Sequence, residues 1–208
     1  VLALSPEHIS LYALGLEPGT ALHSWVQRGR MDLPEDDFVA DMYEVATERM
    51  ATAGYIQYEI SNWAKQGYAS RHNLQYWRNQ PYLGFGPGAH GYAGGMRYTT
   101  VRSPHRYIHM LNDMAAISTF PCSPAVLEAQ SVGREDEIAE TLITGLRLLG
   151  EGVERAAFQA RFGVDLMELH GETLRRFGEL NLLVIDDGRV RLTQQGRLVS
   201  NVIFRELV

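Results

Sequence analysis

The first third of the chain shows a strand pattern, a helix pattern and a second strand pattern. Residues 8–14 form a short apolar run between turn residues, which is typical of a buried parallel strand. Residues 34–53 carry apolar side chains at helical spacing, and acidic residues crowd the start, where the helix dipole favours them. Residues 55–61 alternate β-forming side chains and run into a polar, aromatic segment that we interpret as a loop. The order predicts one βαβ unit.

The middle of the chain predicts one more strand and one more helix before the periodicity fades. Residues 96–101 have a strand pattern, and residues 104–112 predict a helix with Ser103 as its N-cap. Residues 116–134 contain two prolines and little periodicity, so we interpret them as a linker.

The last part of the chain predicts a mostly helical domain. Residues 135–149 form a strongly amphipathic helix. Two further helices, a hairpin with an Asp-Gly turn and a terminal helix are predicted at residues 155–162, 166–180, 182–192 and 193–206. Three helices and a hairpin are similar to a winged-helix module, but the third helix offers only Arg175 and Arg176 as a basic pair, which favours packing or partner docking over DNA binding. The pattern indicates an α/β chain with a first domain at 1–115, a linker at 116–134 and a winged-helix-like domain at 135–208.

Composition and charge limit the classes of function. With 208 residues and 45% hydrophobic content, the chain is long enough to fold around a core. The formal net charge of −6 argues against a general nucleic-acid binder, which needs a basic face to displace counterions from phosphates. No apolar run reaches the roughly 18 to 20 residues of a membrane span, and no signal-peptide pattern is visible. We therefore expect a cytoplasmic protein without an integral membrane segment.

Metal sites built from several cysteines are excluded within this chain, because Cys122 is its one cysteine. His105 and His109 are four residues apart on a predicted helix, but no third ligand candidate lies near them, so we expect no metal site there. The chain begins at Val1 inside a strand pattern and without a methionine. We therefore expect that it is a fragment.

Residues 55–92 carry most of the candidate chemistry. Two histidines, two tryptophans, several tyrosines and a glycine-rich turn fall within this stretch, which is the composition of a ligand-facing surface. Glycines at 84, 86 and 88 surround Pro87 and allow a close approach of the backbone to a ligand, with His90 just beyond the turn. The alternative is that these aromatic side chains belong to a core and that the histidines are satisfied polar residues.

The order of three motifs resembles one family. The motifs are Tyr-Glu-Ile-Ser-Asn-Trp-Ala at 58–64, His-Asn-x-x-Tyr-Trp at 72–77 and Leu-Gly-x-Gly-Pro-Gly-Ala-His at 83–90. In this order the chain is similar to the HemW group of heme chaperones, relatives of the oxygen-independent coproporphyrinogen III oxidases in the radical SAM superfamily. The resemblance covers essentially all of the chain, including the domain at 135–208.

The resemblance implies a fold and two cofactors. Residues 1–115 would be the C-terminal part of an incomplete TIM-type (β/α)6 radical SAM barrel, followed by the winged-helix-like domain. Members of the superfamily hold a [4Fe–4S] cluster on three cysteines of a C-x-x-x-C-x-x-C loop and bind S-adenosylmethionine at the cluster. That loop is not present in this chain, so the cluster cysteines are expected upstream of it, and no residue of this chain is expected to bind the cluster.

The resemblance also implies which residues meet S-adenosylmethionine. By matching positions, Gly15 at a strand end and Ala89 with His90 correspond to family residues beside the adenosyl group. These positions follow strands, and in parallel sheets ligands bind at the C-terminal strand ends.

For heme, the resemblance points to His72 as the axial ligand of the iron, since a neutral imidazole is a good ligand for it. Tyr76 and Trp77 are expected to pack on the flat macrocycle, and Asn73 to offer a polar contact. The alternative is that His72 and Asn73 only hydrogen-bond the loop.

Three functions remain open from the sequence. The first is a heme chaperone that binds heme and transfers it to an acceptor protein. The second is an oxygen-independent coproporphyrinogen III oxidase, which removes carboxyl groups in porphyrin biosynthesis, although the fragment alone is not expected to be catalytic. The third is a winged-helix module for protein interaction. The partners implied are heme or porphyrin and a heme acceptor.

Overall fold

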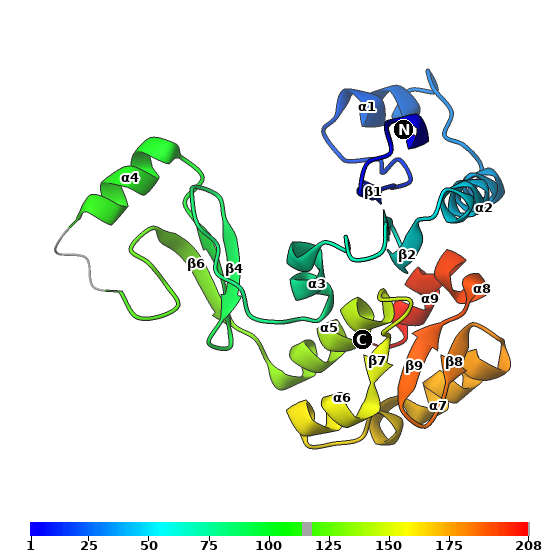
Figure 1. Cartoon of the computed structure of the whole chain (residues 1–208). Helices are drawn as coiled ribbons and strands as arrows, with labels where there is room; N and C mark the ends of the chain where they lie inside the picture. The colour runs from blue at the N-terminus through cyan, green and yellow to red at the C-terminus, as the bar shows by residue number, and fades with distance from the viewer. Residues whose placement is uncertain (114–117, 208) are drawn as a thin grey trace.

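The computed structural model describes residues 1–113 and 118–207, so the predicted domain boundary at residues 115 and 116 lies outside the described residues. Figure 1 shows three parts: a small N-terminal sheet with its helices, an arm and a C-terminal module. Within the described ranges, no helix combines the length and the apolar character that crossing a membrane requires.

The N-terminal sheet contains β1 (His8–Ser10), β2 (Ile56–Glu59) and β3 (Asn62–Ala64), in the order β1-β3-β2. Both β1 and β2 pair antiparallel with β3, so the prediction of a parallel strand at residues 8–14 was wrong. The cause is the tight turn at residues 60–61, which folds β3 back between the other two strands. β1 and β2 still run in the same direction, but they are not neighbours, and the predicted βαβ unit is not formed by adjacent strands.

Helices α1 (Ala21–Gln27) and α2 (Asp36–Thr52) connect β1 to β2, preceded by the 3₁₀ helix η1 (Leu2–Leu4). The helix predicted at 34–53 is confirmed. Its last turn packs Met50 against a small core around the fully buried Trp63. Three large apolar residues of α2 stay exposed, namely Phe38, Met42 and Val45.

The arm consists of β4 (His90–Ala93), β5 (Met96–Thr100) and β6 (Val126–Ser131), an antiparallel sheet in that order, together with α4 (Pro104–Asn112). The strand at 96–101 and the helix with Ser103 as its N-cap are confirmed. β6 was not predicted, because it lies inside the segment interpreted as a linker. Five of its six residues are exposed, so it lacks the apolar alternation that marks a half-buried strand.

The C-terminal module, residues 134–207, contains five helices and a three-stranded sheet within its described length. The helices are α5 (Arg134–Leu146), α6 (Arg155–Phe162), α7 (Leu166–Glu179), α8 (Gln194–Leu198) and α9 (Ser200–Arg205). The antiparallel sheet has the order β7-β9-β8, formed by β7 (Val153–Glu154), β8 (Leu183–Ile185) and β9 (Arg189–Leu192). The three predicted helices and the hairpin are confirmed, whereas β7 was not predicted.

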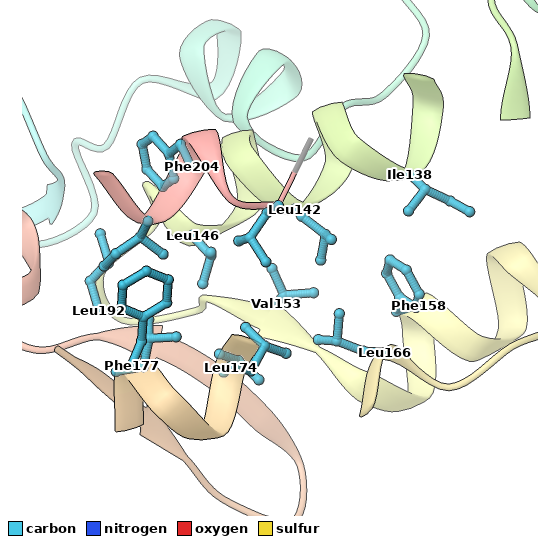
Figure 2. Close-up of a cluster of buried hydrophobic side chains, with 14 of the residues drawn as sticks. Ile138, Leu142, Leu146, Val153, Phe158, Leu166, Leu174, Phe177, Leu192 and Phe204 are labelled. Atoms are coloured by element: carbon cyan, nitrogen blue, oxygen red, sulfur yellow. The ribbon is translucent and has the colours of Figure 1, made fainter. Parts of the chain in front are cut away.

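The core of the module lies between α5, α6, α7 and the sheet (Figure 2). Leu142, Leu146, Leu174 and Val190 are almost completely buried there. The single terminal helix predicted from residue 193 is instead broken at Val199, whose dihedral angles φ −113° and ψ 20° leave the helical region. The two helices pack against different parts of the module. α8 lies against the backbone of residue 182, whereas α9 inserts its buried side chains into the core.

Candidate functional site

The segment predicted as a loop forms a hairpin strand and then a short helix. Helix α3 (Arg71–Trp77) begins after Ser70, whose side chain accepts a hydrogen bond from the Asn73 backbone N–H over 3.2 Å. Serine is a favoured N-cap because its hydroxyl satisfies a backbone donor of the first helical turn. The loop prediction for this segment was wrong, and Ser70 is the signal that could have corrected it.

One face of α3 carries His72 and Tyr76, which are one helical turn apart. His72 is exposed, and its ring meets Tyr76 edge to face, with centroids 4.9 Å apart and planes at 86°. Tyr76 meets Tyr82 in the same manner at 4.6 Å. These distances and angles are favourable for aromatic pairs. The three side chains, called the aromatic row here, lead from α3 to the arm, because Tyr82 pairs with Tyr92 of β4.

An adjacent face of α3, about 100° round the helix axis, carries Asn73 and Trp77 and points toward the body of the protein. Trp77 lies under the guanidinium of Arg147, whose carbon is 4.7 Å from the ring centroid. The Asn73 side chain and the Ser70 backbone hydrogen-bond the Tyr58 phenol. Burial raises the pKa of Tyr58, and these two hydrogen bonds oppose the shift. The four residues predicted to meet heme are therefore divided between two faces of one helix.

Behind α3 lies a buried ion pair that joins the N-terminal sheet to the C-terminal module. Glu59 is 0% exposed, and its Oε1 accepts hydrogen bonds from Arg147 Nε at 2.7 Å and from a terminal nitrogen at 2.6 Å. Its Oε2 accepts from the Ser61 backbone N–H at 2.9 Å and from the Asn62 side-chain amide. Both oxygens of the carboxylate are thus used, which is the condition for a buried charge to be tolerated.

Backbone hydrogen bonds also join the N-terminal sheet to the C-terminal module, and this contact region is called the junction here. The Leu149 N–H donates to the Tyr58 carbonyl at 3.1 Å, and the Ile60 N–H donates to the Arg147 carbonyl at 3.2 Å. Tyr58 also contacts β1 through a hydrogen bond of 2.9 Å with His8 Nε2, and burial lowers the pKa of His8. β2 is therefore connected to β1 on one side and to the C-terminal module on the other.

The glycine-rich turn is built around Thr100. Its hydroxyl donates to the Gly86 carbonyl at 2.6 Å and accepts from the Ala89 N–H at 2.9 Å. Gly86 has φ 103°, a conformation that side chains disfavour. At Gly84 a β-carbon would lie 2.1 Å from the His90 carbonyl oxygen. The glycines serve this close packing of the chain against itself.

His90 is exposed at the start of β4, with its Nδ1 3.2 Å from the Thr99 hydroxyl. It borders a pocket of about 250 Å³ whose lining includes Tyr82, His90, Arg97, Thr99, Glu128 and Gln130. Since Tyr82 also belongs to the aromatic row, the row and this pocket are continuous.

The residues predicted for S-adenosylmethionine lie in two different parts of the molecule. Gly15 is exposed in the connection between β1 and α1, whereas Ala89 and His90 lie on the arm, which stands apart from β1 and α1 in Figure 1. The structure does not bring these three residues together, and their shared contact with the cofactor stays a prediction.

Comparisons with known proteins find relatives along almost the whole chain. The family model described as the HemN C-terminal domain matches residues 132–199. The chain is 39% identical over 203 residues to the heme chaperone HemW of Bacillus subtilis (strain 168), an alignment that covers 98% of this chain and 51% of the relative. It is 36% identical to the heme chaperone HemW of Mycobacterium tuberculosis (strain ATCC 25618 / H37Rv), covering 97% and 47%. The chain is thus similar over almost its whole length to HemW heme chaperones, and its residues 132–199 match the HemN C-terminal domain.

A solved structure supports the same relationship at the level of the fold. Coproporphyrinogen III oxidase (HemN) from Escherichia coli, a radical SAM enzyme, superimposes with a TM-score of 0.67 at 14% identity. The superposition covers 99% of this chain and 49% of that one. The predicted α/β class is thereby confirmed. The chain spans about half the length of these relatives.

Sequence reasoning missed two residues that shape the site, Arg147 and Tyr82. Arg147 stands between Leu146 and Leu148 at the end of the amphipathic helix prediction, and a charge inside such an apolar run is a signal for a buried partner. Tyr82 carries no comparable signal, because its role depends on the packing of the arm against α3.

Proposed function

We propose that this chain is the heme-binding part of a heme chaperone, which binds heme through His72 and passes it to an acceptor protein. The observation that carries the proposal is the exposed His72 imidazole on a helix whose adjacent face is fixed to the protein body through Trp77. The relationship to the heme chaperones of B. subtilis and M. tuberculosis supports it.

The chemistry of the exposed face suits a transferable heme. A neutral imidazole nitrogen is a good axial ligand for heme iron. Tyr76 stands perpendicular to His72 and supplies an aromatic edge beside the ligand, and Tyr82 extends the aromatic row toward the arm. Because His72 is exposed, an acceptor protein can approach the other face of the macrocycle. In this proposal Asn73 and Trp77 hold the helix in place, and the outward face meets the heme.

The cofactors of the radical SAM superfamily fit this chain unequally. Its single cysteine cannot supply the thiolates of a [4Fe–4S] cluster, so no reaction step is assigned to a cluster here. The pocket beside His90 offers polar groups from Arg97, Thr99 and Glu128, which suit the hydroxyl and amino-acid groups of S-adenosylmethionine. His90 would contact the nucleoside there, and Ala89 directly precedes it.

The same proposal assigns the N-terminal sheet and its helices to the C-terminal part of an incomplete (β/α)6 barrel. Exposed apolar side chains follow β1 and line α2, and a closed barrel would cover them, namely Leu11, Tyr12, Leu14, Phe38 and Met42. Hydrogen exchange of these segments tests the assignment. We expect slower exchange in a protein of the relatives' full length that contains this chain than in the chain alone.

Hemin titration followed by absorbance tests the heme site. The wild type, His72→Ala and His105→Ala are compared, since His105 is an exposed histidine on α4 far along the chain from the aromatic row. We expect His72→Ala to lose the Soret shift and to weaken binding beyond the roughly 10- to 100-fold typical of removing an outer contact. His105→Ala should bind like the wild type. A Soret shift that survives in His72→Ala would exclude His72 as the ligand.

The second candidate is the oxidase activity of a coproporphyrinogen III oxidase. The match to the HemN C-terminal domain and the superposition on HemN favour it. Turnover of coproporphyrinogen by a reconstituted, complete protein that contains this chain decides between the two functions, because a chaperone binds heme without consuming this substrate.

A further inference from the structure

We propose that Arg147 is a positioning residue for the heme site: through Trp77 it sets the orientation of α3, and thereby the direction of the His72 face. The role of the orientation in heme binding rests on the proposed function. The orientation itself follows from contacts that do not involve heme.

Helix α3 is too short to define its own position. It has seven residues, and isolated helices of that length are not stable in water, so its place depends on tertiary contacts. Its outward face contacts only other partly exposed rings of the aromatic row, as far as the described residues show. The contacts of Asn73 and Trp77 on the inward face therefore help to fix the helix, together with the attachments of the residues that follow it.

Arg147 is suited to fix Trp77 because its guanidinium is itself held in one plane. Two of its nitrogens bind the same carboxylate oxygen of Glu59, which is completely buried, and the Arg147 side chain is only 22% exposed. The guanidinium carbon then lies over the indole, 4.7 Å from the ring centroid. A cation over an aromatic face is favourable, and more so when water is excluded.

The carboxylate that holds Arg147 is fixed from two strands. Glu59 Oε2 is bound by the side chain of Asn62, which is also fully buried and accepts a hydrogen bond from the Ser10 hydroxyl at 2.7 Å. The contact path therefore runs from β1 through β3 and β2 to Arg147 and ends at the indole of Trp77.

The residues after α3 attach to the same module as Arg147. The Asn79 side chain donates to the Thr141 hydroxyl at 3.0 Å, and Arg161 donates to the Asn79 carbonyl at 2.9 Å. The other end of α3 is attached to the N-terminal sheet, where Asn73 meets Tyr58. The helix thus spans the junction, and Arg147 links its C-terminal end to the buried charge at the centre of that junction.

The experiment uses Arg147→Lys and Trp77→Leu in the purified protein, with Arg78→Lys as the matched control. Lysine keeps a positive charge for Glu59 but lacks the flat face, whereas Trp77→Leu leaves the ion pair untouched. The Trp77 indole N–H has no hydrogen-bond partner among the described residues, so its replacement breaks no such bond. Arg78 is the C-cap of α3 and forms an exposed pair with Glu151 at 2.7 Å.

Hydrogen exchange of the α3 amides, measured by mass spectrometry without heme, is the first measurement. Arg147→Lys and Trp77→Leu should speed this exchange by about 5- to 30-fold, the factor that corresponds to losing one desolvated cation–π contact. Exchange in α7 should not change. The second measurement is hemin affinity, which should fall by a similar factor while the Soret maximum stays that of the wild type. Trp77→Phe, which retains a flat ring, should restore most of both.

Two results would overturn the inference. One is α3 exchange in Arg147→Lys and Trp77→Leu that equals that of Arg78→Lys. The other is faster exchange of α3 and α7 alike, because that outcome means general loss of structure. A wild type that does not bind hemin would refute the proposed function, yet the exchange measurement would still decide whether Arg147 positions α3.

Discussion

Replacing Glu59 by glutamine should destabilise the protein far more than the small change in shape suggests. The carboxylate accepts hydrogen bonds at both oxygens, from Arg147 at Oε1 and from Ser61 and Asn62 at Oε2. A glutamine offers one acceptor oxygen and one NH₂ donor. Whichever way the amide turns, its donor faces at least one group that also donates.

The magnitude follows from counting the groups left without a partner. Each buried donor that loses its acceptor costs about 1–3 kcal/mol. Breaking a buried ion pair by changing one partner typically costs about 3–5 kcal/mol. We therefore expect Glu59→Gln to lower the free energy of unfolding by about 3–5 kcal/mol. The control is Glu151→Gln, whose exposed pair with Arg78 is worth at most about 1 kcal/mol.

Urea unfolding followed by tryptophan fluorescence measures the effect, because Trp63 is fully buried in the same small sheet. Circular dichroism at the helical band follows the C-terminal module in parallel. A loss for Glu59→Gln below about 1 kcal/mol, or one equal to that of Glu151→Gln, would refute the reasoning. Such a result would mean that water reaches the carboxylate in solution, contrary to the complete burial of Glu59 in the structure.

Three further predictions concern the C-terminal module. Gly152→Ala should lower the free energy of unfolding in urea by at least about 2 kcal/mol, since φ is +58° and a β-carbon would lie 2.3 Å from a backbone oxygen of β9. The control Gly150→Ala should be nearly neutral, because a β-carbon there meets open space. Leu174→Ala should cost about 2–5 kcal/mol because the side chain is 1% exposed, and the exposed Leu180→Ala should change stability by less than about 0.5 kcal/mol. Burial lowers the pKa of His170 below its ordinary 6.5, so the folded state binds fewer protons than the unfolded state. The free energy of unfolding is therefore at its full value above pH 6.5 and declines as the pH falls below it. His170→Gln should reduce the dependence of the melting temperature on pH between about pH 7 and 5.

Elements with strong local signals could be predicted from the sequence. The helix at 104–112 follows a Ser-Pro start, and its cap is formed by the Ser103 side chain. The helix at 155–162 ends at Gly163, whose φ of 70° is the usual left-handed C-cap. The hairpin turn is held by Asp186, whose side chain accepts from the Gly188 and Arg189 N–H groups. In each case the deciding interaction spans only a few residues.

Elements that depend on distant partners could not be predicted. β3 has three residues, too few for any periodicity, and its pairing joins Ile9 to Trp63 across the two helices between them. β6 owes its existence to β5, since its own side chains are mostly exposed. The two faces of α3 would have followed from the sequence once Ser70 was taken as a cap, because residues four apart share a face. That Trp77 faces Arg147 would not have followed.

The motif Tyr58-Glu59 explains how one short strand serves two contacts. Neighbouring residues of a regular strand point to opposite faces. The register of β2 against β3 shifts between Gln57 and Glu59, which places a bulge at Tyr58. Bulges redirect side chains and are frequent beside functional sites. Here the phenol reaches His8 and the neighbouring carboxylate reaches Arg147.

The aromatic and polar residues of the central stretch are thus largely used to join the parts of the molecule. Trp63 fills the small core, Glu59 pairs with Arg147, and Trp77 lies beneath that arginine. A composition that suggests a ligand surface can therefore arise from a junction, which is the alternative that the sequence left open. What distinguishes His72 is its position: it is exposed on the outward face of the helix that this junction holds. The junction gives that face a fixed direction, and a fixed direction is what a ligand histidine needs to meet heme iron in one geometry.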